Sequence, residues 1–465
     1  MKFTKKQTAA YGLGAVGKDM VYALSASYVM YYYQDILGLK ASFVGMILMI
    51  ARVFDAANDP FMGVLVAKTK SRFGRFRPWL FSGTVLNALV LYALFSAPSL
   101  AGTGLMVYFA VIYILWGVTY TMMDIPYWSM IPAVTDNAKD RESLSVVGRT
   151  CAGAGNALIT VFTVMSVALL GGTMANGAVN EKLGFSRLAL IVAVLFVITE
   201  TVCVTALKEE STQDEMRTTS VKEMFSSLFA NDQAMVTVVT IILINCALYI
   251  TSNLIIYFFK YDIGGTDWQT AYTLFTSVGG GAQILGMMIG YPALRKKYDN
   301  TKIFRICLTA AVTGYVIILA ECMLGLAGSL PLLIIPGLLV FAGNGILTVL
   351  TTVFLSASVD YGELKTGHRE ESVIFSMQTF VVKAASGFAV FLTGIGLDLI
   401  GLAGNSDTEG VVVQQASSTL LGLRLMMTVL PIFGLLAAMI VFRKKFILTD
   451  QKSDEIAAEL KQRKG

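Results

Sequence analysis

The sequence predicts an all-α membrane protein whose twelve transmembrane helices form two parallel six-helix halves. Three observations support this prediction: the composition, the spacing of the apolar runs and a weak internal repeat. Of the 465 residues, 55% are hydrophobic and only 14% are charged, with a mean hydropathy of +0.67. A water-soluble chain of this length is far less apolar. We therefore expect a helical chain that crosses the lipid bilayer many times.

Apolar runs of about 20 residues follow one another with short breaks, and each is long enough to cross a bilayer as a helix. The twelve runs cover residues 12–37, 42–66, 78–98, 105–131, 145–171, 186–207, 233–260, 270–294, 302–326, 330–357, 372–402 and 417–442. An even number of spans places both termini on one side of the membrane. The loop at 68–77 carries five basic residues. Since the loops on the opposite side carry almost none, the positive-inside rule predicts that both termini lie in the cytoplasm.

The chain also repeats itself weakly. YYYQDILG at 31–38 recurs in outline as YFFKYDIG at 257–264, and DRES at 140–143 recurs as REES at 369–372. Both offsets are close to half of the chain, and the order is the same. Such a parallel repeat of six helices is the architecture of the major facilitator transporters. The expected parts are a bundle at 1–207, a cytoplasmic linker at 208–231, a second bundle at 232–445 and a cytoplasmic tail at 446–465. We expect the tyrosine clusters to lie at the membrane–water interface.

The second span is unusually polar for a membrane helix. An ionised Asp at the centre of a spanning helix costs about 2.5 to 3.5 kcal/mol, so such residues usually face a cavity on an ion or substrate path. Arg52, Asp55 and Asp59 are spaced three and four apart and project from one helical face. Pro60 also leaves the carbonyl group of Ala56 without its helical partner. Two carboxylates on one face can hold a desolvated cation. The alternative is a structural salt bridge, in which Arg52 neutralises only one of them.

The fourth span presents Thr121, Asp124 and Trp128 at positions i, i+3 and i+7, which share one helical face. A carboxylate accepts hydrogen bonds from sugar hydroxyls, and an aromatic ring packs against the apolar face of a pyranose. This pattern predicts a sugar platform. An ion pair of Asp124 with Lys18 or Arg149 is compatible with it.

Other polar residues lie within the expected spans. Lys18 and Asp19 are adjacent and diverge by about 100° on a helix, so we do not expect both to face one point. Lys383 is the deep cation of the second half. It is expected either to approach the acidic residues of the first half or to extend toward the membrane surface. Glu200, Glu321 and Asp398 look buried by position but lack polar neighbours at helical spacing, and we expect structural or helix-end roles for them.

The composition argues against several other classes of protein. The five cysteines all lie in apolar runs, and the single histidine leaves no material for a His-based zinc site or catalytic triad. We therefore expect neither an enzyme nor a resident cofactor. The net charge of +5 is distributed over short loops instead of one patch, which does not indicate nucleic acid as a partner.

Taken together, these residues resemble the glycoside-pentoside-hexuronide:cation symporters, a branch of the major facilitator superfamily, and within them the melibiose permeases. The likeness covers essentially the whole chain. It rests on YGLGAVGKD at 11–19, RVFDAANDP at 52–60, SRFGRFRPW at 71–79, MDIPYWS at 123–129, VDYGE at 359–363 and QTFVVK at 378–383. One departure is the segment at 345–350, which lacks the tryptophan that melibiose carriers have in the tenth span.

The resemblance implies roles for individual residues. The cation would be bound by Asp55, Asp59 and Thr121, with Lys383 nearby. The sugar site would be lined by Lys18, Asp19, Asp124, Trp128 and Arg149, and closed from the other half by Gln378 and Thr379. Cytoplasmic salt bridges would assist gating, and the candidates are Arg141, Arg72 and Arg75 against Asp140, Glu142, Asp360 and Glu363.

The predicted function is secondary active symport of an α-galactoside such as melibiose with Na⁺, by a chain that works as a monomer. The same fold carrying a β-glucuronide or a xyloside, or coupled to H⁺ or Li⁺, is the nearest alternative, because two carboxylates in a low dielectric can also hold a proton. A membrane sugar sensor that binds without transport is a more distant alternative.

Overall fold

The structure is a computed structural model that describes residues 4–69, 71–134, 138–174, 178–207, 209, 229–263, 267–366, 371–404 and 412–464. Within these ranges the side chains of Arg141, Gln378 and Thr379, among others, are outside the described part. The described residues are almost all helical, and the β-interaction among them is one isolated bridge between Thr173 and Val179. The predicted all-α class is confirmed.

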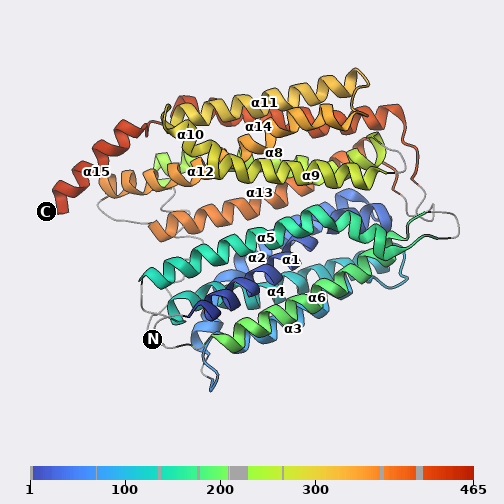
Figure 1. The fold of residues 1–465 in the computed structure, drawn as a ribbon, viewed down its shortest axis with the longest axis horizontal. Coiled ribbons are helices and arrows are strands. Elements are labelled where there is room, and N and C mark those ends of the chain that lie inside the picture. The colour runs from blue at the N-terminus through green and yellow to red at the C-terminus, as the bar shows by residue number, and fades with distance from the viewer. Residues whose placement is uncertain are drawn as a thin grey trace. The chain divides into compact units, whose positions relative to one another are not determined.

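The chain divides into two compact units, residues 1–218 with 403–413, and residues 219–402 with 414–465. The helices of the first unit are α1 (Lys5–Tyr31), η1 (Tyr32–Ile36), α2 (Ala41–Lys68), α3 (Arg77–Leu94), α4 (Gly102–Val134), α5 (Ala138–Gly171) and α6 (Glu181–Ala206). In this unit α1 packs against α5 and α6, while α4 packs against both α2 and α3 (Figure 1). Helices α1, α2 and α4 carry most of the residues predicted to bind cation and sugar.

The second unit contains the remaining helices. They are α8 (Asp232–Tyr257), η2 (Phe258–Ile263), α9 (Trp268–Leu285), η3 (Gly286–Gly290), α10 (Tyr291–Arg295), α11 (Asn300–Met323), α12 (Leu330–Thr366), α13 (Glu371–Leu399), α14 (Ser417–Lys445) and α15 (Asp450–Lys464). Each of the twelve expected spans coincides with helical segments of the described chain. Eight of these helices, α4, α5, α6, α8, α11, α12, α13 and α14, are individually long and apolar enough to cross a membrane.

Helix starts in the first unit are fixed by local hydrogen bonds. Thr4 and Gln7 form a reciprocal capping box at the start of α1. At the start of α3, the carboxylate of Glu209 accepts hydrogen bonds from the backbone N–H groups of Arg75, Phe76 and Arg77, at 2.7, 2.9 and 3.1 Å. Such an anion at a helix N-terminus satisfies donors that have no partner within the helix. Glu209, the second residue of the linker predicted at 208–231, is therefore fixed to the α2–α3 loop.

The repeated aromatic segments have a common structure that the sequence pattern did not predict. Both α1 and α8 end in a π-helix, η1 and η2 respectively. Tyr32 and Tyr33 are fully buried, and the ring of Tyr33 lies 4.2 Å from that of Phe109. The Tyr33 hydroxyl donates to the carbonyl oxygen of Leu94 at 2.8 Å. Tyr32 and Tyr33 therefore pack inside the first unit. Their position at the membrane–water interface remains a prediction.

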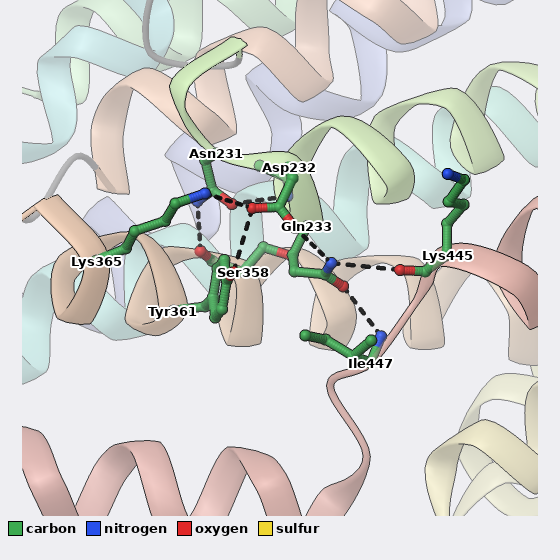
Figure 2. A network of polar contacts seen from close by, with 9 residues as sticks. Asn231, Asp232, Gln233, Ser358, Tyr361, Lys365, Lys445 and Ile447 are labelled. Atoms are coloured by element: carbon green, nitrogen blue, oxygen red, sulfur yellow. Dashed lines mark hydrogen bonds and ion pairs between the residues drawn. The ribbon is translucent and has the colours of Figure 1, made fainter.

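In the second unit, a polar network joins the start of α8 to α12 and to the end of α14 (Figure 2). Asn231 caps α8 and donates to the carbonyl oxygen of Ser358 on α12 at 2.7 Å. Lys365 pairs with Asp232 at 2.7 Å, and the Gln233 side chain donates to the carbonyl oxygen of Lys445 at the end of α14. The network therefore fixes the start of α8 against the ends of α12 and α14.

Candidate functional site

Lys18 lies at the centre of the candidate sugar site. It is on α1 and is only 3% exposed. Its ammonium group donates to Asp124 Oδ1 on α4 at 2.7 Å and to the Tyr120 hydroxyl at 3.3 Å, and it lies 3.0 Å from Asp19 Oδ2. Burying a charge of this kind is costly unless it is paired. Here two carboxylates share one ammonium group, and the expected ion pair of Lys18 with Asp124 is confirmed.

The close approach of Lys18 to Asp19 corrects one expectation. Adjacent residues on a helix point about 100° apart, which suggested that the two side chains do not face one point. Instead, the four-carbon chain of Lys18 spans that angle. The contact is a close ion pair without hydrogen-bond geometry, since Asp19 Oδ2 has no hydrogen-bond partner among the described residues.

Aromatic rings surround the same ammonium group. The Lys18 nitrogen lies 5.1 Å from the centroid of the Trp128 ring and 5.5 Å from that of Tyr127. The Trp128 indole also donates to Asp124 Oδ1 at 3.2 Å, one helical turn away. Arg149, on α5, places its guanidinium 4.2 Å from the Trp128 ring centroid. The structure therefore brings together all five sugar-site residues predicted for the first half.

The acidic pair of α2 forms a second cluster. Asp55 is 8% exposed, and its Oδ2 lies 3.9 Å from Arg52 Nη1, a long ion pair. Asp59 Oδ1 accepts a hydrogen bond from the Thr121 hydroxyl on α4 at 3.4 Å. Asp59 and Thr121 are therefore in contact between α2 and α4, while Asp55 lies against α4 one turn earlier, at Gly117. The role of the three residues as one cation site remains a prediction. Carboxylate and hydroxyl oxygens are suitable ligands for a hard cation.

Helix α4 contributes to both clusters. Thr121 contacts α2, whereas Asp124 and Trp128 contact Lys18 on α1. The single face predicted from their spacing is therefore shared between two neighbouring helices. The candidate cation ligands and the candidate sugar ligands are only three residues apart along α4.

Sequence reasoning missed two residues of these clusters. Tyr120 lies one turn before Asp124, and its hydroxyl accepts a hydrogen bond from Lys18. A side chain at Gly117 would collide with Asp55, because its Cβ would lie 2.5 Å from Asp55 Oδ1. The i−4 spacing from Asp124 and Thr121 is a signal that could have found both residues.

The predicted residues of the second unit are described only in part. Lys383 is partly buried on α13, and its backbone carbonyl accepts from Ser386 at 2.7 Å. Asp360 and Glu363 lie in the last two turns of α12, and Glu363 is buried. Gln378, Thr379 and Arg141 lie outside the described side chains. The roles of these residues in binding and gating therefore remain predictions.

The three other acidic residues considered in the spans differ in burial. Glu200 is fully buried on α6, and neither carboxylate oxygen has a hydrogen-bond partner among the described residues. Glu321 is partly buried. Asp398 is exposed near the end of α13, so the expectation that it is buried is wrong, while its helix-end position agrees with the expected alternative.

Comparison with known proteins extends the description of the chain. A family model described as MFS/sugar transport protein matches residues 10–449. The uncharacterized symporter YjmB of Bacillus subtilis is 27% identical over 99% of this chain and 96% of its own length. The lactose permease of Lactobacillus delbrueckii subsp. bulgaricus is 26% identical over 98% of this chain and 72% of its own length.

Solved structures support the fold. The inward-facing, unoccupied structure of a bacterial homologue of the human lysosomal transporter Spinster has a TM-score of 0.67. It covers 97% of this chain and 96% of its own length, at 11% sequence identity. At an identity this low, the similarity supports a conclusion about the fold only. Together with the family match, these findings show that the chain has the major facilitator fold and belongs to the MFS/sugar transport family, as a glycoside-pentoside-hexuronide:cation symporter.

Proposed function

We propose that this symporter imports an α-galactoside such as melibiose together with Na⁺. The observation that carries the proposal is the pair of clusters on α4, one rich in oxygen ligands at Asp55, Asp59 and Thr121, the other formed around Lys18 and Asp124. The first suits a monovalent cation. The second presents a carboxylate, which can accept hydrogen bonds from sugar hydroxyls, and an aromatic ring, which can pack against the apolar face of a pyranose. Lactose is named as the substrate of one relative, which supports a glycoside as the cargo.

The two clusters suggest how the cation and sugar cooperate. A cation held between Asp55 and Asp59, together with the nearby Arg52, balances the charge of the two carboxylates and favours the packing of α2 on α4. Since α4 also carries Asp124, this packing influences the sugar site. The coupling is reciprocal, so the cation raises sugar affinity by the factor by which sugar raises cation affinity. A sugar hydroxyl that binds Asp124 also competes with Lys18 for the same oxygen.

Transport follows by alternating access of the two halves around a central site. Moving one charge through a membrane potential releases about 2.3 kcal/mol per 100 mV, enough for roughly fifty-fold accumulation of sugar per 100 mV. The proposal places a monomer in the bacterial inner membrane with both termini cytoplasmic. It includes bundles at 1–207 and 232–445 around a linker, with Lys383, Gln378 and Thr379 at the site and Arg141, Asp360 and Glu363 in gating.

The proposal is tested by counterflow of labelled melibiose in membrane vesicles, with Na⁺, Li⁺ or protons as the only cation. We expect Na⁺ to stimulate exchange in the wild type, and Asp59→Cys to abolish that stimulation. The matched control is Met62→Cys, which places the same side chain at a buried apolar position of α2. Exchange that is unaffected by Na⁺ and by the Asp59 substitution refutes the cation site. Stimulation by protons alone identifies H⁺ as the coupling ion, and exchange of another glycoside but not melibiose changes only the substrate.

A further inference from the structure

Asn87 on α3 makes an unusual buried connection to α4. The residue is 0% exposed. Its side-chain Nδ2 donates to the carbonyl oxygen of Trp116 at 3.0 Å and to the Thr119 hydroxyl oxygen at 2.9 Å. Both acceptors belong to a single turn of α4. The two bonds therefore fix that turn against α3.

The same turn forms one wall of the candidate cation site. It contains Gly117, whose missing side chain leaves room for Asp55 of α2. Thr121, which donates to Asp59, follows one turn later. A small rotation of α4 about its axis would therefore displace the surfaces that meet both carboxylates of α2. Asn87 holds α4 from α3, which packs on α4 as α2 does.

The rest of the Asn87 side chain makes a purely structural role a poor explanation. Its Oδ1 is buried without a hydrogen-bond partner in the described part of the protein. Leaving a buried polar atom in that state costs about 1 to 3 kcal/mol, which offsets much of what the two hydrogen bonds of Nδ2 contribute. The amide group therefore adds little net stability at this position. What it adds is directional, because only a donor can fix the Trp116 carbonyl and the Thr119 hydroxyl together.

We propose that Asn87 is a positioning residue for the cation site, which holds the 116–119 turn where Gly117 and Thr121 receive the two carboxylates of α2. Asn87 acts through α4 and does not itself contact Asp55 or Asp59. This inference rests on the proposed function, since it assumes that a cation binds there. It assigns a role in coupling to α3, which carries none of the residues predicted from the sequence.

The test compares Asn87→Leu with the matched control Thr84→Val. Thr84 lies on α3 close to one turn before Asn87 and is equally buried, but its hydroxyl donates to the Leu80 carbonyl oxygen of its own helix. Two quantities are measured in vesicles: the Na⁺ concentration for half-maximal stimulation of counterflow, and the sugar affinity without Na⁺. Loss of about one net hydrogen bond predicts that Asn87→Leu raises the half-maximal Na⁺ concentration roughly fivefold. We expect its sugar affinity without Na⁺ to change less than twofold. Thr84→Val should change neither the half-maximal Na⁺ concentration nor the sugar affinity.

The outcomes separate the inference from the function on which it rests. Equal Na⁺ responses of Asn87→Leu and Thr84→Val overturn the positioning role, as does equal weakening of the cation and sugar responses. A wild type that no cation stimulates overturns the proposed function itself and the inference with it. If Asn87→Leu fails to reach the membrane, Thr119→Val removes an acceptor from the other end of the same connection. An unchanged Na⁺ response in that variant also overturns the inference.

Discussion

Replacing Asp124 by asparagine separates the sugar site from the cation site. The substitution keeps the shape of the side chain but removes its charge. Asp124 Oδ1 accepts hydrogen bonds from the Lys18 ammonium at 2.7 Å and from the Trp128 indole at 3.2 Å. Lys18 retains Asp19 as an ionic partner at 3.0 Å. Breaking a buried ion pair by removing the only partner of a charge costs about 3 to 5 kcal/mol. Because Lys18 keeps one ionic partner, we expect Asp124→Asn to lower the free energy of unfolding by less than this.

The expected loss of sugar affinity follows from the hydrogen bonds that sugar hydroxyls would donate to Asp124. A hydrogen bond to a charged group contributes about 1.5 to 3 kcal/mol, against about 0.5 to 1.5 kcal/mol for a neutral pair. Neutralising Asp124 therefore costs about 1 to 1.5 kcal/mol for each bond that a sugar hydroxyl makes to it. Two such bonds predict a loss of about 2 to 3 kcal/mol, which is roughly 30- to 150-fold in the dissociation constant.

Isothermal titration calorimetry of the purified protein measures this loss directly. The glycoside that the wild type transports is titrated into wild type and Asp124→Asn at saturating Na⁺, and Na⁺ is titrated in a separate experiment. We expect the sugar dissociation constant to rise by the stated factor and intrinsic Na⁺ binding without sugar to persist. A sugar affinity within threefold of the wild type, with Na⁺ binding intact, would remove Asp124 from the sugar site. Simultaneous loss of sugar binding and Na⁺ binding would point to misfolding, which a thermal unfolding scan of the variant detects.

Two further predictions concern other parts of the structure. Gly117→Ala places a methyl group against Asp55 Oδ1. We therefore expect Na⁺ stimulation of counterflow to fall by about tenfold, equivalent to about 1.4 kcal/mol, while exchange without Na⁺ persists. An unchanged Na⁺ response would contradict the proposed packing. Asp262→Ala removes the bidentate partner of Arg424, whose nitrogens lie 2.8 and 2.6 Å from the carboxylate. We expect the free energy of unfolding to fall by about 3 kcal/mol. Thermal unfolding measures that loss, and Asp262→Asn, which keeps one acceptor oxygen, should lose less.

The helices were predictable because a membrane imposes a simple rule. Every backbone polar group in the bilayer must be satisfied internally, so an apolar run of about 20 residues predicts a helix with few alternatives. The same rule says little about how a helix ends. The echo between residues 31–38 and 257–264 indicated a repeat, yet it gave no sign of the π-helical geometry of η1 and η2 or of the aromatic rings that pack against Tyr33. Tertiary packing of that kind cannot be read from hydrophobic periodicity.

The candidate site was predictable at the level of single helices. Spacing along α2 and α4 correctly grouped Arg52 with Asp55 and Asp124 with Trp128. It failed where a side chain is long, as for Lys18, which reaches both its neighbour Asp19 and Asp124. It also failed for Asn87 and Gly117, whose importance depends on which helix each one faces. Contacts between helices that are distant in sequence carry this information.

These contacts explain how one helix can couple two ligands. Within α4, Thr121 belongs to the cation cluster and Asp124 to the sugar cluster, and the helix is supported on a third side by Asn87. An α-helix transmits a displacement over three residues with little loss, because its hydrogen bonds link each turn to the next. In the proposed function, a cation that draws Asp59 toward Thr121 would therefore change the position of Asp124 relative to Lys18. Because binding free energies are linked, a sugar that draws Asp124 away from Lys18 would then change cation affinity by the same factor.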